Sequence, residues 1–272
     1  MVGFPTAKIN IGLRITGKRS DGYHNIETIF YPVDLCDALE IVEAEDETSD
    51  DTITVTGIDP GVADPDNLVI RAIGALRQKH TIPALNIHLH KVIPPGAGLG
   101  GGSSDAACTL ITVNRQFRLM LHPSELKSIA LELGSDCPFF INPVPLHATG
   151  RGEILIPVMP LNKEYYIILL NHGIGINTKE AYDNCKPAMP SVSLMELYSQ
   201  PVSEWKDLIY NDFEEYVFGK YPLTGEFKKV LYDSGALFSS MSGSGSTVYG
   251  IFDSEPDLPG AITKYIIYSG LM

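Results

Sequence analysis

A glycine-rich stretch from Pro94 to Asp105 has the residue types and spacing best suited to chemistry. Five of the nine residues from Gly96 to Ser104 are glycine. Glycine costs chain entropy on folding, so this density predicts a backbone that bends tightly or lies close to a ligand. A strand-like alternation precedes the stretch, and helical apolar spacing, with Ser103 or Ser104 as the expected cap, follows it. A glycine loop at a helix N-terminus is a natural phosphate-binding site.

The loop fits none of three familiar phosphate-binding patterns. A P-loop needs lysine before its serine or threonine, whereas glycine precedes Ser103. The Rossmann spacing is met by Gly96, Gly98 and Gly101, but the required acidic residue is absent near Leu121. The downstream His-Arg-Asp and Asp-Phe-Gly motifs of protein kinases are also absent. A linker or tight turn is the simpler alternative, although a plain turn needs only one or two glycines.

Two other segments must position polar side chains. Residues 6–16 alternate strictly, which predicts a strand with Lys8 and Asn10 as neighbours on its polar face. That face either lines a site or is solvated. Residues 135–138 form a sharp turn before an apolar run, and its Asp136 is either a general base or the cap of a short helical turn.

Aromatic side chains follow two further turns. Tyr23 and His24 come directly after turn-forming residues, and they either form a shelf for a flat base or pack into the core. Thr178 is expected to cap a helix that carries Tyr182.

An acidic run and a histidine pair are given structural interpretations. Residues 43–51 are expected to form the solvated tip of a hairpin between strands 39–42 and 52–55. His88 and His90 share one face of a strand, and a solvent-facing position is favoured over a metal site because no third ligand is placed by the sequence.

Composition and charge argue against nucleic-acid-binding and membrane proteins. The 272 residues carry a net charge of −13, which argues against nucleic-acid or anionic-membrane binding. The four scattered cysteines indicate reduced thiols and a cytoplasmic protein. No apolar run is long enough to span a membrane, and because the first motif begins at Ala7 no targeting peptide is expected.

Four separated stretches resemble the small-molecule kinases that include galactokinase, homoserine kinase and mevalonate kinase. They are Ala7–Leu13 with Asp21–His24, the loop Pro94–Ser104, Gly134–Pro138 and Met241–Val248. Their shared order along the chain makes the resemblance specific. Within this superfamily, the chain most resembles the kinases whose acceptor is 4-diphosphocytidyl-2-C-methyl-D-erythritol, in non-mevalonate isoprenoid (terpenoid) synthesis. One departure is Ser246, where those kinases commonly have alanine.

The resemblance implies ATP-dependent phosphorylation of the 2-hydroxyl of that cytidyl alcohol. Asp136 would accept the hydroxyl proton, and Lys8 would keep Asp136 ionised and orient the hydroxyl. Mg²⁺ is expected near Ser103 or Ser104. The implied ATP-binding residues are Pro94, Pro95, Gly96, Ala97, Gly98, Leu99, Gly100, Gly101, Gly102, Ser103 and Ser104. The implied substrate-binding residues are Asn10, Tyr23, His24, Thr178 and Tyr182, with Gly243–Gly245 buttressing the loop or touching the diphosphate.

The resemblance also implies an α+β, two-domain small-molecule kinase fold with the active site in the interdomain cleft. We expect an ATP-binding and catalytic domain over residues 1–158 and a substrate-binding domain over 159–272, because the proline-punctuated segment 154–160 is the best boundary. Two small-molecule partners are expected, with no nucleic acid or membrane, and a homodimer is left open. The alternatives are another kinase of the superfamily, such as homoserine or mevalonate kinase, and a nucleotide-binding regulator without catalysis.

Overall fold

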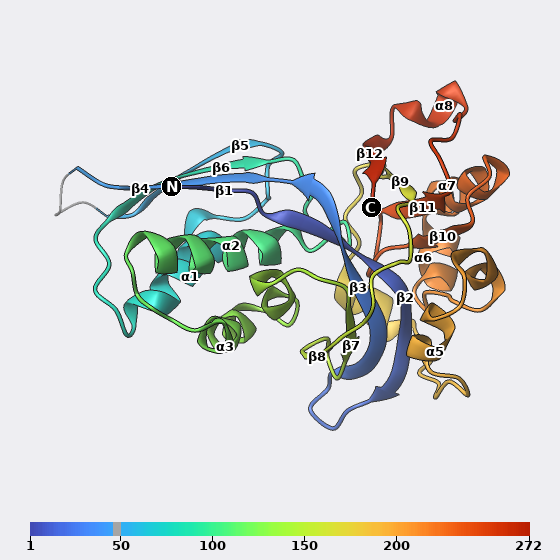
Figure 1. The fold of residues 1–272 in the computed structure, drawn as a ribbon, viewed down its shortest axis with the longest axis horizontal. Helices are drawn as coiled ribbons and strands as arrows, with labels where there is room; N and C mark the ends of the chain where they lie inside the picture. Colours follow the sequence, from blue (N-terminus) through green and yellow to red (C-terminus); the bar gives the residue numbers. More distant parts are fainter. Residues whose placement is uncertain (46–49) are drawn as a thin grey trace. The chain divides into compact units, whose positions relative to one another are not determined.

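The computed structural model describes residues 1–45 and 50–272, which form two compact units (Figure 1). The first unit contains residues 1–7, 35–95 and 100–143, and the second contains residues 8–34, 96–99 and 144–272. Each unit combines strands and helices, and the α+β class is confirmed. The units are interleaved along the chain, so residues 96–99 of the glycine loop belong to the second unit and the residues on either side of them to the first. The predicted functional division at residue 158 stays a prediction.

A four-stranded sheet and three helices make up most of the first unit. The sheet order is β1 (Val2–Gly3), β4 (Ala38–Glu43), β6 (Leu85–Lys91), β5 (Thr52–Gly57). The helices are α1 (Leu68–Arg77), α2 (Gly101–Gln116) and α3 (Pro123–Leu133), with 3₁₀ turns η1 (Asp64–Asp66) and η2 (Cys137–Ile141). Figure 1 shows α1 and α2 along one face of this sheet. Apolar side chains of β4 and β6 pack there against α1 and α2 and form the core of the unit.

The pairing of strand β6 contradicts the predicted hairpin, and its exposed histidines confirm the predicted solvent-facing position. β4 pairs antiparallel with β6 and β5 pairs parallel with it, so the predicted hairpin of 39–42 with 52–55 is wrong. Strand β6 has more buried residues than β4 or β5, and it lies between these two strands in the sheet. Residues 46–49 of the predicted hairpin tip lie outside the described residues. His88 and His90 are exposed and both contact the Thr56 hydroxyl, at 2.9 and 3.0 Å. The described ranges contain no group of three or more His, Cys, Asp or Glu side chains that could hold a metal ion.

Helix α2 begins directly from the glycine loop. Its N-cap is Gly100, which has a φ of 73° and makes no side-chain capping bond, so the prediction of a serine cap is wrong. Glycine adopts this left-handed conformation without a steric penalty and turns the chain straight into the helix. The Ser104 N–H donates to the Gly100 carbonyl oxygen at 2.9 Å. The N–H groups of the three helical residues before Ser104 have no acceptor within the helix, as at any helix N-terminus.

Two four-stranded sheets and five short helices form the second unit. One sheet has the order β2 (Thr6–Lys18), β3 (His24–Cys36), β7 (Leu146–Thr149), β8 (Ile154–Pro157). The other has the order β10 (Phe238–Met241), β11 (Val248–Phe252), β9 (Tyr166–Leu170), β12 (Ile266–Leu271). The remaining elements are α4 (Thr178–Asp183), α5 (Leu194–Tyr198), η3 (Val202–Asp207), α6 (Glu214–Lys220), α7 (Pro222–Asp233) and α8 (Gly260–Thr263). In the part of the chain that is described, no helix combines the length and apolarity needed to cross a bilayer.

Strand β2 is buried on both faces, although its sequence alternates. Its apolar residues Ile9 and Ile11 are fully buried, and Lys8 and Asn10 are only 3% and 1% exposed. The Leu13 N–H donates to the Tyr210 carbonyl oxygen at 3.0 Å, and the Tyr249 hydroxyl donates to the Asn10 carbonyl oxygen at 2.9 Å. The interpretation of a solvated polar face is therefore wrong, because segments distant in sequence cover it.

Candidate functional site

Residues 97–99 of the glycine loop are fixed by hydrogen bonds inside the second unit. The Lys8 N–H donates to the Leu99 carbonyl oxygen at 3.0 Å, and the Thr247 N–H donates to the Ala97 carbonyl oxygen at 3.2 Å. The Ser242 hydroxyl donates to the Gly98 carbonyl oxygen at 2.8 Å and accepts from the Asn10 N–H at 3.1 Å. These bonds order the loop through the protein's own groups, and a loop ordered in this way loses less entropy when it binds a ligand.

Gly98 occupies a position that only glycine can take without distortion. Its φ is 79°, and a Cβ built on it would lie 1.9 Å from the Ser242 carbonyl oxygen. A Cβ on Gly243 would likewise lie 3.1 Å from the Cα of Gly98. The predicted buttressing of the loop by residues 243–245 thus has a direct backbone contact in the structure.

Lys8 is buried beside this part of the loop. Its Nζ donates to the Gly98 carbonyl oxygen at 3.0 Å and to Asn10 Oδ1, and it lies 5.1 Å from the centre of the Phe30 ring. The Asn10 amide also donates to the Thr28 hydroxyl at 2.9 Å. Both polar atoms of the Asn10 side chain therefore contact the protein, and Asn10 orients the Lys8 ammonium.

Residues 100–104 of the loop lie in the first unit, together with the turn that carries Asp136. Asp136 is the N-cap residue of η2, but its side chain makes no capping hydrogen bond. The capping interpretation of this carboxylate is therefore wrong. The neighbouring Cys137 thiol is hydrogen-bonded to the Ser103 side chain, and burial raises the pKa of Cys137 to about 11. Ser103 of the loop and the Asp136 turn are thus brought together, whereas the predicted pairing of Lys8 with Asp136 stays a prediction.

Predicted aromatic residues meet in the second unit. The rings of His24 and Tyr182 are stacked, with centroids 5.0 Å apart and an interplanar angle of 13°. This spacing leaves no room for a third ring between them, so a flat base would have to stack on an outer face. Tyr23 is 56% exposed, and the Arg151 guanidinium lies 4.8 Å from the centre of its ring.

Thr178 lies close to the serine-glycine segment 243–245, but it does not cap α4. The cap is Asn177, whose side chain accepts from the Glu180 N–H at 3.2 Å. Asparagine at this position satisfies the helix N–H, and Thr178 becomes the first helical residue. Its hydroxyl lies 3.0 Å from the Ser244 hydroxyl.

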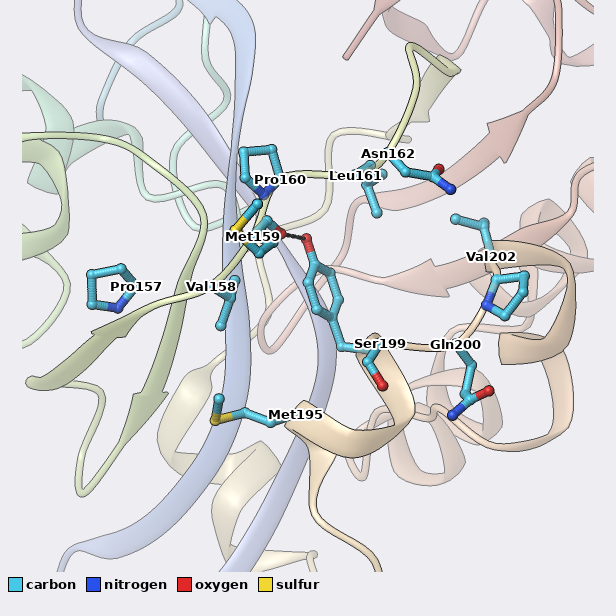
Figure 2. Close-up of a pocket in the computed structure, with 12 residues that line it drawn as sticks. Pro157, Val158, Met159, Pro160, Leu161, Asn162, Met195, Ser199, Gln200 and Val202 are labelled. Atoms are coloured by element: carbon cyan, nitrogen blue, oxygen red, sulfur yellow. Dashed lines mark hydrogen bonds between the residues drawn. The ribbon is translucent and has the colours of Figure 1, made fainter.

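A separate pocket of about 510 Å³ lies between β8, α5 and η3 in the second unit (Figure 2). The Tyr198 hydroxyl donates to the Met159 carbonyl oxygen at 2.9 Å within it. Its lining residues, all between 157 and 202, include none of the predicted site residues and no charged side chain. Charged donors bind phosphate groups most strongly, so a pocket without a charged side chain is a poor candidate for a nucleotide phosphate site.

Sequence reasoning missed a buried ionic cluster next to the loop. It consists of Lys91, Asp37 and Asp105, whose side chains are at most 4% exposed. One signal was available: Lys91 continues the buried side of the β6 alternation after Leu85, Ile87 and Leu89. A lysine at a core position requires an acidic partner.

The chain is similar to known proteins over nearly all of its length. Residues 67–142 match the GHMP kinases N terminal domain, and residues 194–265 match the GHMP kinases C terminal domain. It is 51% identical over 253 residues to the 4-diphosphocytidyl-2-C-methyl-D-erythritol kinase of Parabacteroides distasonis, covering 93% of this chain and 92% of the relative. It is 46% identical over 259 residues to the protein of that name from Bacteroides thetaiotaomicron, covering 95% and 94%.

A solved structure extends this similarity to the fold. The crystal structure of 4-(cytidine 5'-diphospho)-2C-methyl-D-erythritol kinase superposes with a TM-score of 0.79 at 27% identity. The alignment covers all of this chain and 98% of the other.

Proposed function

The chain belongs to the GHMP kinase family, and from this membership we propose that it phosphorylates the 2-hydroxyl of 4-diphosphocytidyl-2-C-methyl-D-erythritol with ATP. The observation that carries the proposal is the name shared by relatives that are 46–51% identical over more than nine-tenths of the chain. The same similarity favours this acceptor over homoserine and mevalonate.

Three groups of residues supply the parts that phosphoryl transfer needs. The acceptor oxygen attacks the γ-phosphorus, the bond to the β–γ bridging oxygen breaks, and ADP leaves. Asp136 takes the hydroxyl proton, and the Lys8 ammonium stabilises the developing negative charge. The preformed loop from Pro94 to Ser104 binds the phosphates through backbone N–H groups, which compensates for the net charge of −13.

The loop serines also fit a magnesium ion carried by ATP. Mg²⁺ prefers oxygen ligands and keeps several waters, and when bound with ATP it neutralises phosphate charge. Ser103 is half-buried, whereas Ser104 is only 2% exposed. Ser103 is therefore the better placed of the two hydroxyls.

The cytidyl alcohol is assigned to the aromatic and polar groups of the second unit. His24, Tyr23 and Tyr182 would recognise the cytosine by stacking and by hydrogen bonds to its polar edge. The Thr178 hydroxyl, which faces Ser244, would contact the sugar alcohol or diphosphate. Asn10 would orient the Lys8 ammonium toward the hydroxyl group that accepts the phosphate.

The proposal is tested by following phosphorylated product with a panel of alcohols. The diphosphocytidyl alcohol should be turned over efficiently, and homoserine and mevalonate should not. Comparable turnover of either of the other two would reassign the enzyme within the family. ATP binding without product from any alcohol would indicate a regulator.

Replacing Tyr23 by alanine tests the position of the cytosine. Base–aromatic stacking contributes about 1–3 kcal/mol, so the KM for the cytidyl alcohol should rise roughly 5- to 150-fold while the KM for ATP stays unchanged. Tyr210 is a matched control, because it is 47% exposed and lies 5.3 Å from the Arg14 guanidinium. Tyr210→Ala should leave both KM values unchanged. A Tyr23→Ala defect in ATP binding alone would place Tyr23 at the other nucleotide.

A further inference from the structure

Lys91 is a buried cation on the strand that leads into the glycine loop. It is 3% exposed and ends β6 on the side that faces the core. Burying an unpaired ammonium is strongly unfavourable, so its partners must be held firmly in place. Two residues, Val92 and Ile93, separate Lys91 from the start of the loop at Pro94.

Two carboxylates from different elements meet the Lys91 ammonium. Nζ donates to Asp105 Oδ2 at 2.6 Å and to Asp37 Oδ2. Asp37 lies between β3 and β4, and Asp105 is the fifth residue of α2. The cluster therefore joins the end of β6, the start of β4 and the start of α2 at one point.

The same cluster also fixes the backbone just before the loop and at the loop residue where α2 begins. Asp37 Oδ1 accepts from the N–H groups of Val92 and Ile93, at 2.5 and 2.8 Å, immediately before the loop. At the start of α2, within the loop, a Cβ built on Gly101 would lie 2.8 Å from Ile93 Cγ2 and 3.3 Å from Lys91 Nζ. The first residue of α2 thus packs directly on the residues that the cluster holds.

We infer that Lys91, Asp37 and Asp105 are positioning residues for ATP, which hold the N-terminus of α2 in the geometry that binds its phosphates. The inference rests on the proposed function, because it assigns the loop to ATP. The three side chains act through the backbone of the loop and do not touch the nucleotide.

The two carboxylates play unequal parts in this cluster. Asp37 uses both oxygens as acceptors, one for Lys91 and one for two backbone N–H groups. Asp105 uses only Oδ2, and its Oδ1 is buried without a hydrogen-bond partner. Burial, together with the charge of Asp37, raises the pKa of Asp105 to about 7 against the opposing effect of Lys91. An amide can therefore replace Asp105, whereas at Asp37 it would direct an NH₂ group at an ammonium or a backbone N–H.

The test compares three single amide variants of the full chain. Asp51 is the control, because its Oδ1 accepts from the Leu85 N–H at 2.9 Å and from Arg77 at 2.7 Å, at the opposite end of β6. Binding of ATP by calorimetry, the KM of each substrate and the melting temperature are measured for each variant.

Asp37→Asn should weaken ATP binding about tenfold or more and leave the KM of the alcohol unchanged. Asp105→Asn should bind ATP within about twofold of the wild type. Asp51→Asn should lower the melting temperature without changing ATP affinity. A folded Asp37→Asn protein with wild-type ATP affinity overturns the inference, and so does an equal ATP defect in Asp51→Asn, because the effect would then be general destabilisation.

If Asp37→Asn does not fold, Asp105→Leu tests whether the cluster positions α2 for ATP. It removes the acceptor on α2 and keeps the Asp37–Lys91 pair, so ATP affinity should fall about 3- to 10-fold and return with Asp105→Asn. Wild-type ATP affinity in a folded Asp105→Leu protein overturns the inference. ATP binding is measured without the alcohol, so a failure of the proposed acceptor is distinguished from a failure of this inference.

Discussion

Replacing Asp136 by asparagine should lower kcat by about 10²–10⁴-fold, the usual contribution of a general base. The amide keeps the shape of the side chain and cannot accept the hydroxyl proton. Asp136 makes no capping bond to η2, so the substitution removes no cap from the fold. The KM values of both substrates should therefore stay unchanged. An unchanged kcat would assign the proton to another acceptor.

Lys8→Met should cause a loss of similar size, and the double variant should be scarcely worse than either single one. Residues that act as a unit are strongly non-additive. Lys8 also donates to the Gly98 carbonyl oxygen, so this variant should raise the KM for ATP as well. The exposed ion pair of Lys163 with Asp253, at 2.6 Å, is the control, and Lys163→Met with Asp253→Asn should change neither constant. Multiplicative losses at positions 8 and 136 would show that the two residues act independently.

Replacing Gly98 by alanine should raise the KM for ATP by roughly 5- to 150-fold. A non-glycine residue held at a positive φ costs about 1–3 kcal/mol, and each 1.4 kcal/mol corresponds to about tenfold in affinity. The added Cβ would also meet the Ser242 carbonyl oxygen, so the loop must move away from its anchors.

Gly74→Ala is the control for Gly98→Ala. Gly74 lies inside α1, and a Cβ built on it would meet no atom within 4 Å beyond its own stretch of helix, so alanine there should leave ATP turnover unchanged and stabilise the protein by about 0.5–1 kcal/mol. If the folded Gly98→Ala protein had wild-type kinetics, ATP binding would not depend on this loop conformation.

The local elements were predictable because their signals lie within a few residues. The alternation of β6, the helix after the glycine loop and the turn at Asp136 each follow from neighbouring residue types. The predictions of the helix caps were wrong, although they also depend on neighbouring residues, because more than one suitable residue stands at each helix start. At α2 a left-handed Gly100 replaced the serines, and at α4 Asn177 took the place of Thr178.

Contacts across the chain were not predictable from local pattern. The position of β6 between β4 and β5 depends on pairing over more than 30 residues. The burial of Lys8 depends on partners from Phe30 to Gly98, and its strand is covered by Tyr249, which follows Asn10 by 239 positions. The periodicity of a strand shows which side chains share a face, and it cannot show whether another segment covers that face.

The interleaving of the two units sets an order of events during synthesis. A nascent chain of 143 residues already contains every segment of the first unit. It also carries Leu13 and Ile15 of β2, whose apolar partners between residues 168 and 262 have yet to be translated. Domains generally fold as units while the ribosome adds about 5–20 residues per second, so β2 would wait several seconds with apolar surface uncovered. This interval is when a chaperone that binds extended apolar segments would have its best access to the chain.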